Sequence, residues 1–345
     1  GPSVEVMEKM ADKSKAKEEM IRAGVPVVPG SKGSVHSVAE GKKVALEIGY
    51  PIMAKAAAGG GGRGMRLIHD ESEFDQLFMA ASSEALAAFG DGTMYLERFI
   101  NNPRHIEVQV VGDSHGNAIH IGERDCSLQR RHQKVIEESP AILLNDETRA
   151  KLHDVAVKAT KYLKYEGAGT FEFLADDKQN IFFMEMNTRL QVEHPVSEMV
   201  SGIDIVELMI KVAEGEKVPP QEAIKFRGHA IEVRITAEDP NSFLPSPGKV
   251  TQWMVPGGRN VRVDSHVYAG YVVPPYYDSM IGKLIVWGRD RNKAINIMKR
   301  ALAEFEVEGI RTTIPFHKKM MENEDFISNN YDTKYLENYK KLEDL

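Results

Sequence analysis

The chain has 345 residues, a formal net charge of −7 and 28% charged residues. This length is enough for more than one domain or subdomain, and the acidic balance argues against bulk affinity for nucleic acid. The single cysteine, Cys126, excludes an intrachain disulfide and a cysteine-based zinc site. The sequence shows no signal peptide and no long apolar run. We therefore expect a cytoplasmic protein without a nucleic-acid or membrane partner.

Helix caps, prolines and glycines divide the first part of the chain into short elements, which indicate a small α+β lobe over 31–98. In chain order we expect helix 4–23, strand 27–28, helix 37–48, strand 51–55, strand 65–68, helix 71–89 and strand 94–96. The glycine run Gly59–Gly62 separates two of these strands, so it is expected to form a loop between them.

From His105 onward, alternating apolar and polar residues predict strands, with helices between some of them. We expect strands 106–110 and 118–121, helix 146–163, strands 168–174 and 181–187, helix 198–214, strand 228–235, strands near 250, 261 and 283, and helix 291–305. Because no regular strand–helix–strand repeat appears, the predicted fold class is α+β rather than a doubly wound sheet.

The run 183–195 is the most informative part of the sequence. Residues two apart on an extended chain share a side. If the run is extended, one side carries Glu185, Asn187, Arg189, Gln191 and Glu193, and the other carries Phe182, Met184 and Met186 as a core face. Two carboxylates, two amides and a guanidinium on one ribbon fit a site that holds a metal-bound phosphate and a second small anion.

Glu172 is a lone carboxylate in an otherwise apolar strand, and a buried carboxylate needs a partner. With Glu185 and Asn187 it would offer oxygen ligands to Mg²⁺ or Mn²⁺. The alternative is a carboxylate paired with a buried arginine.

Three further segments carry candidate chemistry. Lys55 with the following glycines suits phosphate binding, although a flexible hairpin tip is an equal alternative. The basic run 124–134 is either a solvated loop or a site for ribose and phosphate. In strand 228–235, Glu232 and Arg234 face away from the apolar residues, and a lone His105 is more often structural.

Together and in this order, these motifs resemble biotin carboxylase, of the ATP-grasp superfamily, and most closely the biotin carboxylase subunit of bacterial acetyl-CoA carboxylases. The resemblance spans essentially the whole chain. It is carried by Lys55 with Gly59–Gly62, by segments 123–127, 131–134, 169–173, 185–189 and 191–195, and by the proline-containing segments 244–248 and 274–279.

The resemblance implies ATP-dependent carboxylation of biotin by bicarbonate through carboxyphosphate. The implied nucleotide contacts are Lys13, Lys55, Gly61, Gly62, Glu97, Arg98, Phe99, Ile100, His105, Gln129 and His132. The implied metal ligands are Glu172, Glu185 and Asn187. Bicarbonate would meet Lys134, Arg189, Gln191 and Val192, Glu193 would remove its proton, and Arg234 would stabilise carboxyphosphate and the biotin enolate.

The resemblance also implies an ATP-grasp fold in four segments: an entry region 1–30, a lid 31–98, a central body 99–225 and a C-terminal domain 226–345. Its implied partners are a biotin carboxyl carrier protein, carboxyltransferase subunits and a second copy of the chain. Family members begin with a separate N-terminal domain that this sequence lacks, and Arg259 stands where related bacterial enzymes carry an aromatic residue; both features weaken the usual dimer contact.

Two other functions stay open on the sequence alone. One is an ATP-grasp ligase that activates a different carboxylate, which the pattern of Arg189, Glu193 and Arg234 disfavours. The other is an incomplete fragment that binds ATP without turning it over. The sequence does not identify the final acyl acceptor.

Overall fold

The structure is a computed structural model, and it describes residues 1–57, 64–131, 133–339 and 343, with the backbone but not the side chains of Lys13, Ser14 and Asn338. The chain forms two compact units, a smaller one over 26–101 and a larger one over 1–25 and 102–345. Each unit has its own sheet and core, and each is described by itself.

The smaller unit has a three-stranded antiparallel sheet in the order β2-β1-β3, built from Met65–Ile68, Ile52–Ala56 and Met94–Arg98. Helices α3 (Val38–Ile48) and α4 (Glu71–Phe89) supply the other half of its core. Both helices begin at a side-chain cap, because Ser37 and Asp70 accept backbone N–H bonds from their first turns. The expected helices and strands of this lobe are therefore confirmed, except that 27–28 is not a strand.

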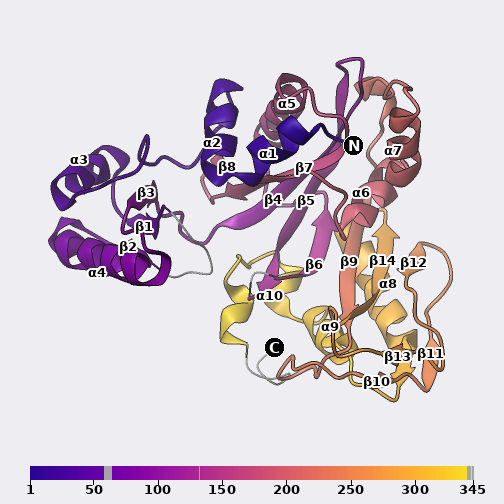
Figure 1. The fold of residues 1–345 in the computed structure, drawn as a ribbon. Coiled ribbons are helices and arrows are strands. Elements are labelled where there is room, and N and C mark those ends of the chain that lie inside the picture. The colour runs from indigo at the N-terminus through magenta and orange to yellow at the C-terminus, as the bar shows by residue number, and fades with distance from the viewer. Residues whose placement is uncertain (58–63, 132, 340–342, 344–345) are drawn as a thin grey trace. The chain divides into compact units, whose positions relative to one another are not determined.

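The larger unit is built on an eight-stranded antiparallel sheet in the order β12-β14-β9-β6-β5-β4-β7-β8 (Figure 1). In that order the strands span Val261–Asp264, Met280–Gly288, His229–Thr236, Gln133–Ser139, Ala118–Arg130, Arg104–Gly112, Gly167–Ala175 and Ile181–Asn187. Two small ribbons, β10 (Gly248–Lys249) with β13 (Val272–Val273) and β11 (Gln252–Met254) with β15 (Glu306–Glu308), accompany it.

Helices cover both faces of this sheet. They are α1 (Val4–Ala11), α2 (Lys13–Arg22), α5 (Asp146–Tyr162), α6 (His194–Ser201), α7 (Ile205–Ala213), α8 (Arg291–Glu304), α9 (Ile314–Met320) and α10 (Glu324–Ile327), with 3-10 turns at Gln221–Ala223 and Tyr335–Asn338. The alternation predicted for β9 decides which helix meets which face. Ala230 packs with residues of α6, whereas Ile231 and Val233 join the core under α8.

Two predicted helices are each divided in two. The helix expected over 4–23 breaks at Asp12, which caps α1 in extended conformation. The helix expected over 198–214 breaks at Gly202, whose left-handed φ of 73° ends α6 and suits a residue without Cβ. Neither break changes which residues lie in the unit. The second break makes α6 and α7 two separate helices.

Strand β5 corrects a larger error. The prediction ended this strand at residue 121 and treated the basic run beginning at Arg124 as a loop or recognition segment. The strand instead continues to Arg130, and Arg124 is fully buried within it. Strand β6 follows directly and was not predicted at all, because its apolar residues are interrupted by Glu137 and Glu138.

A buried polar network surrounds Glu138, which points to the opposite side of β6 from Glu137. Glu138 accepts hydrogen bonds from Arg291 and Tyr331 and pairs with His229 at 2.8 Å. Cross-strand to Glu138, Asp125 pairs with the buried Arg104. Because a buried carboxylate is stable only when its hydrogen-bonding capacity is met, these contacts hold the C-terminal segment against the sheet.

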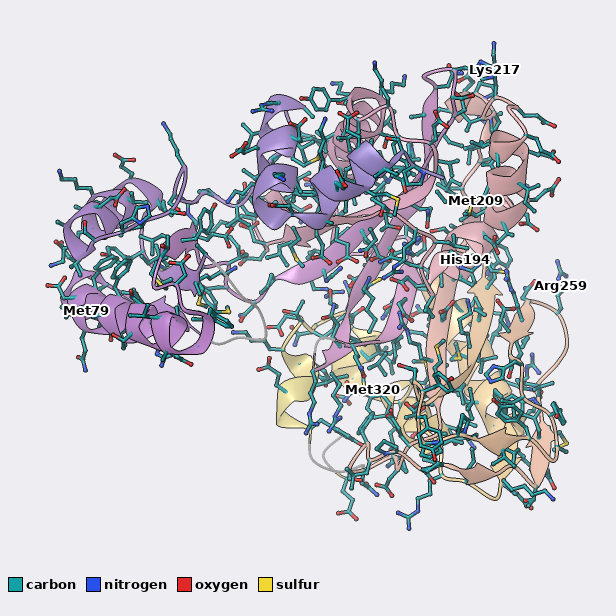
Figure 2. All side chains as sticks on the ribbon, viewed as in Figure 1. Met79, His194, Met209, Lys217, Arg259 and Met320 are labelled. Carbon is teal, nitrogen blue, oxygen red and sulfur yellow. The ribbon has the colours of Figure 1, made fainter. Side chains whose placement is uncertain are left out.

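Among the described residues, none of the helices combines the length and apolar character needed to cross a bilayer. Figure 2 shows Arg259 in the loop that leads into β12, with its side chain pointing away from the ribbon, and this residue is exposed.

Candidate active site

A cavity of about 790 Å³ opens in the larger unit over the middle of the eight-stranded sheet. Many of the predicted site residues line it. They are His105, Gln129, Lys134, Glu172, Glu185, Asn187, Arg189, Gln191, Val192, Glu193 and Arg234. Segments 245–247 and 273–279, whose prolines belong to the motifs noted in the sequence, complete its wall.

The run 183–195 is not one extended ribbon as predicted. A bulge at Met184 shifts the register between β7 and β8, so Phe183 is buried and Met184 is exposed, contrary to the predicted core face, whereas Met186 is buried as predicted. The strand then ends at Asn187, and Glu193 is the N-cap residue of α6. Gln191 and Glu193 nevertheless reach the same cavity as Glu185, because the turn after β8 brings them back over the sheet.

Lys134 on β6 is the cation at the centre of the site. Its Nζ lies 3.0 Å from Glu172 Oε1 and 2.6 Å from Glu193 Oε1, and it also pairs with Glu107. Burial opposes its charge, but Glu107 and the other carboxylates hold the pKa of Lys134 above its ordinary value. Lys134 is therefore a fixed positive charge at neutral pH.

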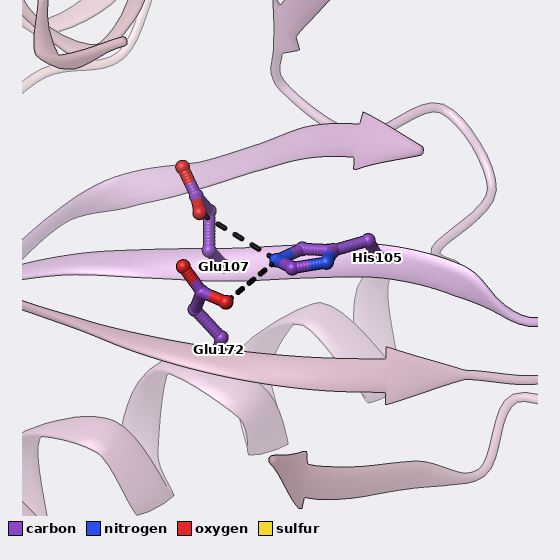
Figure 3. A group of neighbouring side chains, drawn as sticks. All are labelled: His105, Glu107 and Glu172. Carbon is purple, nitrogen blue, oxygen red and sulfur yellow. Dashed lines mark ion pairs between the residues drawn. The ribbon is translucent and has the colours of Figure 1, made fainter. Parts of the chain in front are cut away.

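Figure 3 shows His105, Glu107 and Glu172 together on the neighbouring strands β4 and β7. His105 Nε2 lies 3.1 Å from Glu172 Oε2, in the geometry of an ion pair rather than an aligned hydrogen bond, and 3.8 Å from Glu107 Oε2. On the other side of the ring, His105 Nδ1 lies 3.0 Å from Gln129 Nε2. Burial opposes the charge of Glu172, yet His105 and Lys134 lower its pKa to about 2, so this carboxyl is ionised.

Arg124 lies beneath this cluster and was not predicted as a site residue. It is fully buried and donates to five side chains, those of Glu107, Gln109, Ser197, Thr170 and Gln191. It thereby holds Glu107, which pairs with Lys134, and Gln191, which donates to Glu172 at 2.8 Å. A signal for Glu107 existed, since it is a carboxylate at an alternating position of an apolar strand, as Glu172 is.

Glu193 is held between two cations. Its Oε1 meets Lys134, and its Oε2 accepts from Arg234 Nη2 at 2.9 Å. Arg234 Nε in turn donates to Glu137 Oε1 at 2.6 Å. Glu193 is only 2% exposed, so the two cations determine where its carboxylate points. Sequence reasoning found Glu193 and Arg234 and missed Glu137.

Glu172, Glu185 and Asn187 provide a suitable set of donors for a hard cation. Glu172 and Glu185 are cross-strand partners on β7 and β8, and Asn187 lies two residues further along β8, with its Nδ2 2.9 Å from Glu172 Oε1. Carboxylate and amide oxygens are ligands that Mg²⁺ accepts. The residues present therefore fit the metal predicted for this place.

Two other predicted contacts have simpler surroundings. Arg189 is exposed at the cavity wall, where its guanidinium donates to the Leu190 carbonyl and to Asn187 Oδ1. The Val192 carbonyl accepts a hydrogen bond from Lys283 Nζ at 2.7 Å. Lys283, on β14, was not predicted, and it fixes the backbone between Gln191 and Glu193.

The smaller unit holds several of the other predicted nucleotide contacts. Lys55 Nζ pairs with Glu97 Oε2 at 2.7 Å, Arg98 donates to the Ile48 carbonyl, the Phe99 N–H donates to the Pro51 carbonyl, and Ile100 is buried. Gly61, Gly62, His132 and the Lys13 side chain lie outside the residues that the structure describes.

Two family models match the chain. The Carbamoyl-phosphate synthase L chain, ATP binding domain covers residues 12–221, and the Biotin carboxylase C-terminal domain covers residues 232–338. A biotin carboxylase from Nostoc sp. is 54% identical over 343 residues, which are 99% of this chain and 77% of the relative.

Solved structures agree with these matches. The crystal structure of a biotin carboxylase–beta-gamma-ATP complex from Campylobacter jejuni is 66% identical, with a TM-score of 0.88, over 98% of this chain and 76% of that one. The dimeric biotin carboxylase domain of Hydrogenobacter thermophilus 2-oxoglutarate carboxylase, in complex with MgADP, ADP and bicarbonate, is 50% identical, with a TM-score of 0.86, over 98% of this chain and 75% of that one.

Proposed function

Because the chain belongs to the biotin carboxylase family, with its ATP-grasp fold, we propose that the cavity of the larger unit is the place where bicarbonate is activated for the ATP-dependent carboxylation of biotin. The observation that carries this proposal is the position of Glu193. A buried carboxylate held between Lys134 and Arg234 marks a site where an anionic substrate and its base can share the same two cations.

Glu193 is the proposed general base. Bicarbonate is a poor nucleophile until it loses its proton, and a carboxylate within hydrogen-bond reach can take that proton. When bicarbonate enters, Lys134 and Arg234 can bond its oxygens in place of part of their present contacts with Glu193. The planar guanidinium of Arg234 matches a carboxylate-shaped anion, and Gln191 with the Val192 backbone would orient it.

The negative charge that grows on the phosphoryl group during transfer needs fixed positive charge nearby. Lys134 supplies such a charge within the larger unit. Mg²⁺ held by Glu172, Glu185 and Asn187 would supply charge neutralisation on the nucleotide phosphates; Mn²⁺ is proposed as an alternative ion with the same ligand preference. His105 and Gln129, which contact one another, are proposed to contact the ribose.

The nucleotide roles of the smaller unit are also proposals. Lys55 is proposed to bind phosphate, and the segment Glu97 to Ile100 is proposed to contact adenine. In this unit Lys55 and Glu97 neutralise each other, so phosphate binding would exchange one anionic partner of Lys55 for another. Lys13, Gly61, Gly62 and His132 keep the roles that the resemblance implies, as does the four-segment division of the chain.

The proposed partners are bicarbonate, biotin on a carrier protein, carboxyltransferase subunits and a second copy of the chain. The relatives carry names that include both biotin carboxylase and 2-oxoglutarate carboxylase, so the acyl acceptor is set by whichever carboxyltransferase works with this chain. The cytoplasmic location argued from the sequence stays a prediction.

ADP release by the purified chain, supplied with Mg-ATP and bicarbonate and assayed with and without free biotin, tests the function. We expect release that depends on bicarbonate and is stimulated by biotin. We expect Glu193→Gln to lower this turnover roughly 10²- to 10⁴-fold, because it removes a general base, while nucleotide affinity is retained. The matched control is Glu207→Gln on an exposed face of α7, which should change neither quantity.

Three outcomes would contradict parts of this assignment. Turnover with another carboxylate in place of bicarbonate would indicate a different ATP-grasp ligase. ATP binding without any ADP release would indicate an incomplete enzyme. Retained turnover in Glu193→Gln would remove Glu193 as the base while leaving the function in place.

A further inference from the structure

Two buried carboxyl groups lie directly behind Arg234, and the proposed reaction does not use either of them. Glu137 on β6 and Glu232 on β9 are direct cross-strand partners, and both are 0% exposed. Directly opposed residues of an antiparallel pair have Cβ atoms about 5 Å apart, so the two carboxyls can touch. Neither residue lines the cavity, so substrate does not reach them.

The hydrogen bonds of this pair are incomplete. Glu137 Oε1 accepts from Arg234 Nε, but Glu137 Oε2 and both oxygens of Glu232 are buried with no hydrogen-bond partner among the described residues. Buried polar atoms are rarely left unpaired, and an ionised carboxylate without a partner is costly in the interior. The three unpartnered oxygens therefore call for a proton or a cation.

The nearby cations are engaged with other groups. Arg234 bonds Glu137 and Glu193, and Lys134 bonds Glu107, Glu172 and Glu193. Lys283, which is cross-strand to Arg234, donates to the Val192 carbonyl and lies 3.6 Å from Asp264. None of them donates to Glu232, so an ionised Glu232 would face the like charge of Glu137 without compensation.

We propose that Glu137 and Glu232 form an acid–carboxylate pair that shares one proton and holds Arg234 in the orientation in which its Nη2 meets Glu193. The protonated carboxyl of Glu232 donates to Glu137 Oε2, which gives that oxygen its partner. Glu137 stays anionic and keeps its bond to Arg234 Nε. Two close carboxyls that cannot both ionise are a known arrangement for sharing a proton.

The geometry explains why such a pair matters for Arg234. A guanidinium is planar, so a carboxylate fixed at Nε determines the direction of Nη2. The sheet register fixes Glu137, because β6 pairs with β9 through four consecutive residues from Ile136 to Ser139. A second full negative charge behind Arg234 would draw it away from Glu193 and from the anion that Arg234 is proposed to bind. The shared proton removes that second charge.

Burial, and next the charge of Glu137, raise the pKa of Glu232 well above its ordinary value. Burial also raises the pKa of Glu137 to about 7. The charge of Arg234 opposes this rise, and the charge of Glu193 adds to it. The charged groups that act on the pair are Lys134 on β6, Arg234 on β9, Lys283 on β14 and Glu193 before α6, and Cys126 on β5 senses the charge of Glu137. The neighbouring elements also carry Arg124 on β5, Asp264 on β12, and His194 and Glu198 on α6. The pair should therefore lose its proton as the pH rises above neutral.

The role of the pair rests on the functions proposed above for Arg234 and Glu193, but the proton can be tested without turnover. Infrared spectroscopy distinguishes a protonated carboxyl group from a carboxylate. We expect the wild-type protein at neutral pH to show a protonated carboxyl band that shifts in D₂O, disappears as the pH rises and is absent from Glu232→Gln. If Glu232→Gln fails to fold, the pH titration of the wild-type band tests the same proton. No such band in the wild-type protein would overturn the proposal, and it would indicate two ionised carboxylates or a bound cation.

Turnover measurements then test whether Glu137 and Glu232 position Arg234. We expect Glu137→Leu to lower kcat for bicarbonate-dependent ATP cleavage roughly tenfold to a hundredfold, because Arg234 loses its fixed acceptor. Glu137→Gln, which keeps an oxygen for Arg234 Nε, should restore most of this loss. In Glu232→Gln the loss of activity on the alkaline side should move to higher pH, because the titrating proton is gone.

The matched control is Glu123→Gln, a buried glutamate of the same sheet that pairs with Arg149 and His153 and does not line the cavity. It should lower stability and leave the alkaline limb of kcat unchanged. An unchanged alkaline limb in Glu232→Gln, or a wild-type kcat in Glu137→Leu, would overturn the positioning role. If the wild-type chain shows no biotin-stimulated turnover at all, the proposed function fails, and the infrared result still decides whether the proton is shared.

Discussion

Arg124 offers the sharpest test of how the site is supported. This guanidinium is fully buried and contacts five side chains, and its nearest acceptor, Glu107, is also 0% exposed. Burial opposes the charge of Glu107, but Arg124 and then Lys134 lower its pKa to about 2. The substitution Arg124→Met keeps an apolar stem of similar length and removes the charge and every hydrogen bond.

The expected cost follows from what the substitution leaves behind. Glu107 would retain Lys134 alone, and the side-chain oxygens of Gln109 and Gln191 would lose their buried donor. Removing one partner of a buried ion pair typically costs about 3–5 kcal/mol. We therefore expect Arg124→Met to lower the free energy of unfolding by about that amount, which is a large share of the stability of a typical protein.

Urea unfolding followed by far-ultraviolet circular dichroism measures this cost. The control is Arg300→Met, because Arg300 is 43% exposed and pairs with Glu304 on the surface of α8, where such a pair contributes less than about 1 kcal/mol. In the double variant Arg124→Met with Glu107→Leu, the loss should be smaller than the sum of the two single losses, since no buried charge remains unpaired. A loss in Arg124→Met no larger than that in Arg300→Met would refute the view that Arg124 organises the site.

Two further predictions concern the metal and the pH. Glu185→Gln should weaken Mg²⁺-dependent nucleotide binding, roughly tenfold or more, as measured by calorimetry at varied Mg²⁺; unchanged affinity would refute its role as a ligand. Glu107 and Glu172 have folded-state pKa values lowered to about 2, so their stabilisation is present above their ordinary pKa and is lost as the pH falls toward about 2. The pKa of Glu137 is raised to about 7 and that of Glu232 is raised well above its ordinary value, so the stabilisation by these two groups is present at low pH and is lost as the pH rises through their raised pKa values. The melting temperature of Glu232→Gln should therefore fall less on the alkaline side than that of the wild-type protein, and equal slopes would contradict the assignment.

Local periodicity determined a good part of this protein. Alternation in Ile231, Val233 and Ile235 against Glu232 and Arg234 assigned the two faces of β9 correctly, and the helices predicted over 37–48 and 71–89 match α3 and α4. The motifs along the chain also identified the family and many of the residues that line the cavity. Such signals succeed because they depend on side chains within a few positions of one another.

The sequence misled where the chain departs from regular geometry. The bulge at Met184 and the turn after Asn187 broke the ribbon predicted for 183–195, and the basic run after Glu123 turned out to be a buried strand. A strand rich in charged residues can be buried only if other strands supply its partners. That information is absent from the strand itself.

The tertiary structure alone decided which charges meet. Glu193 and Lys134 are 59 residues apart, and Glu137 and Arg234 are 97 apart. Glu137 meets Arg234 because β6 and β9, which are distant in sequence, are neighbours in the sheet. A shift of one residue in the register of these strands would turn Lys134, Glu137 and Arg234 to the opposite face of the sheet. The sequence therefore specified the chemical groups of the site, whereas the pairing of β4, β5, β6, β7 and β9 determined that Arg124, Glu137 and Glu232 support them from below.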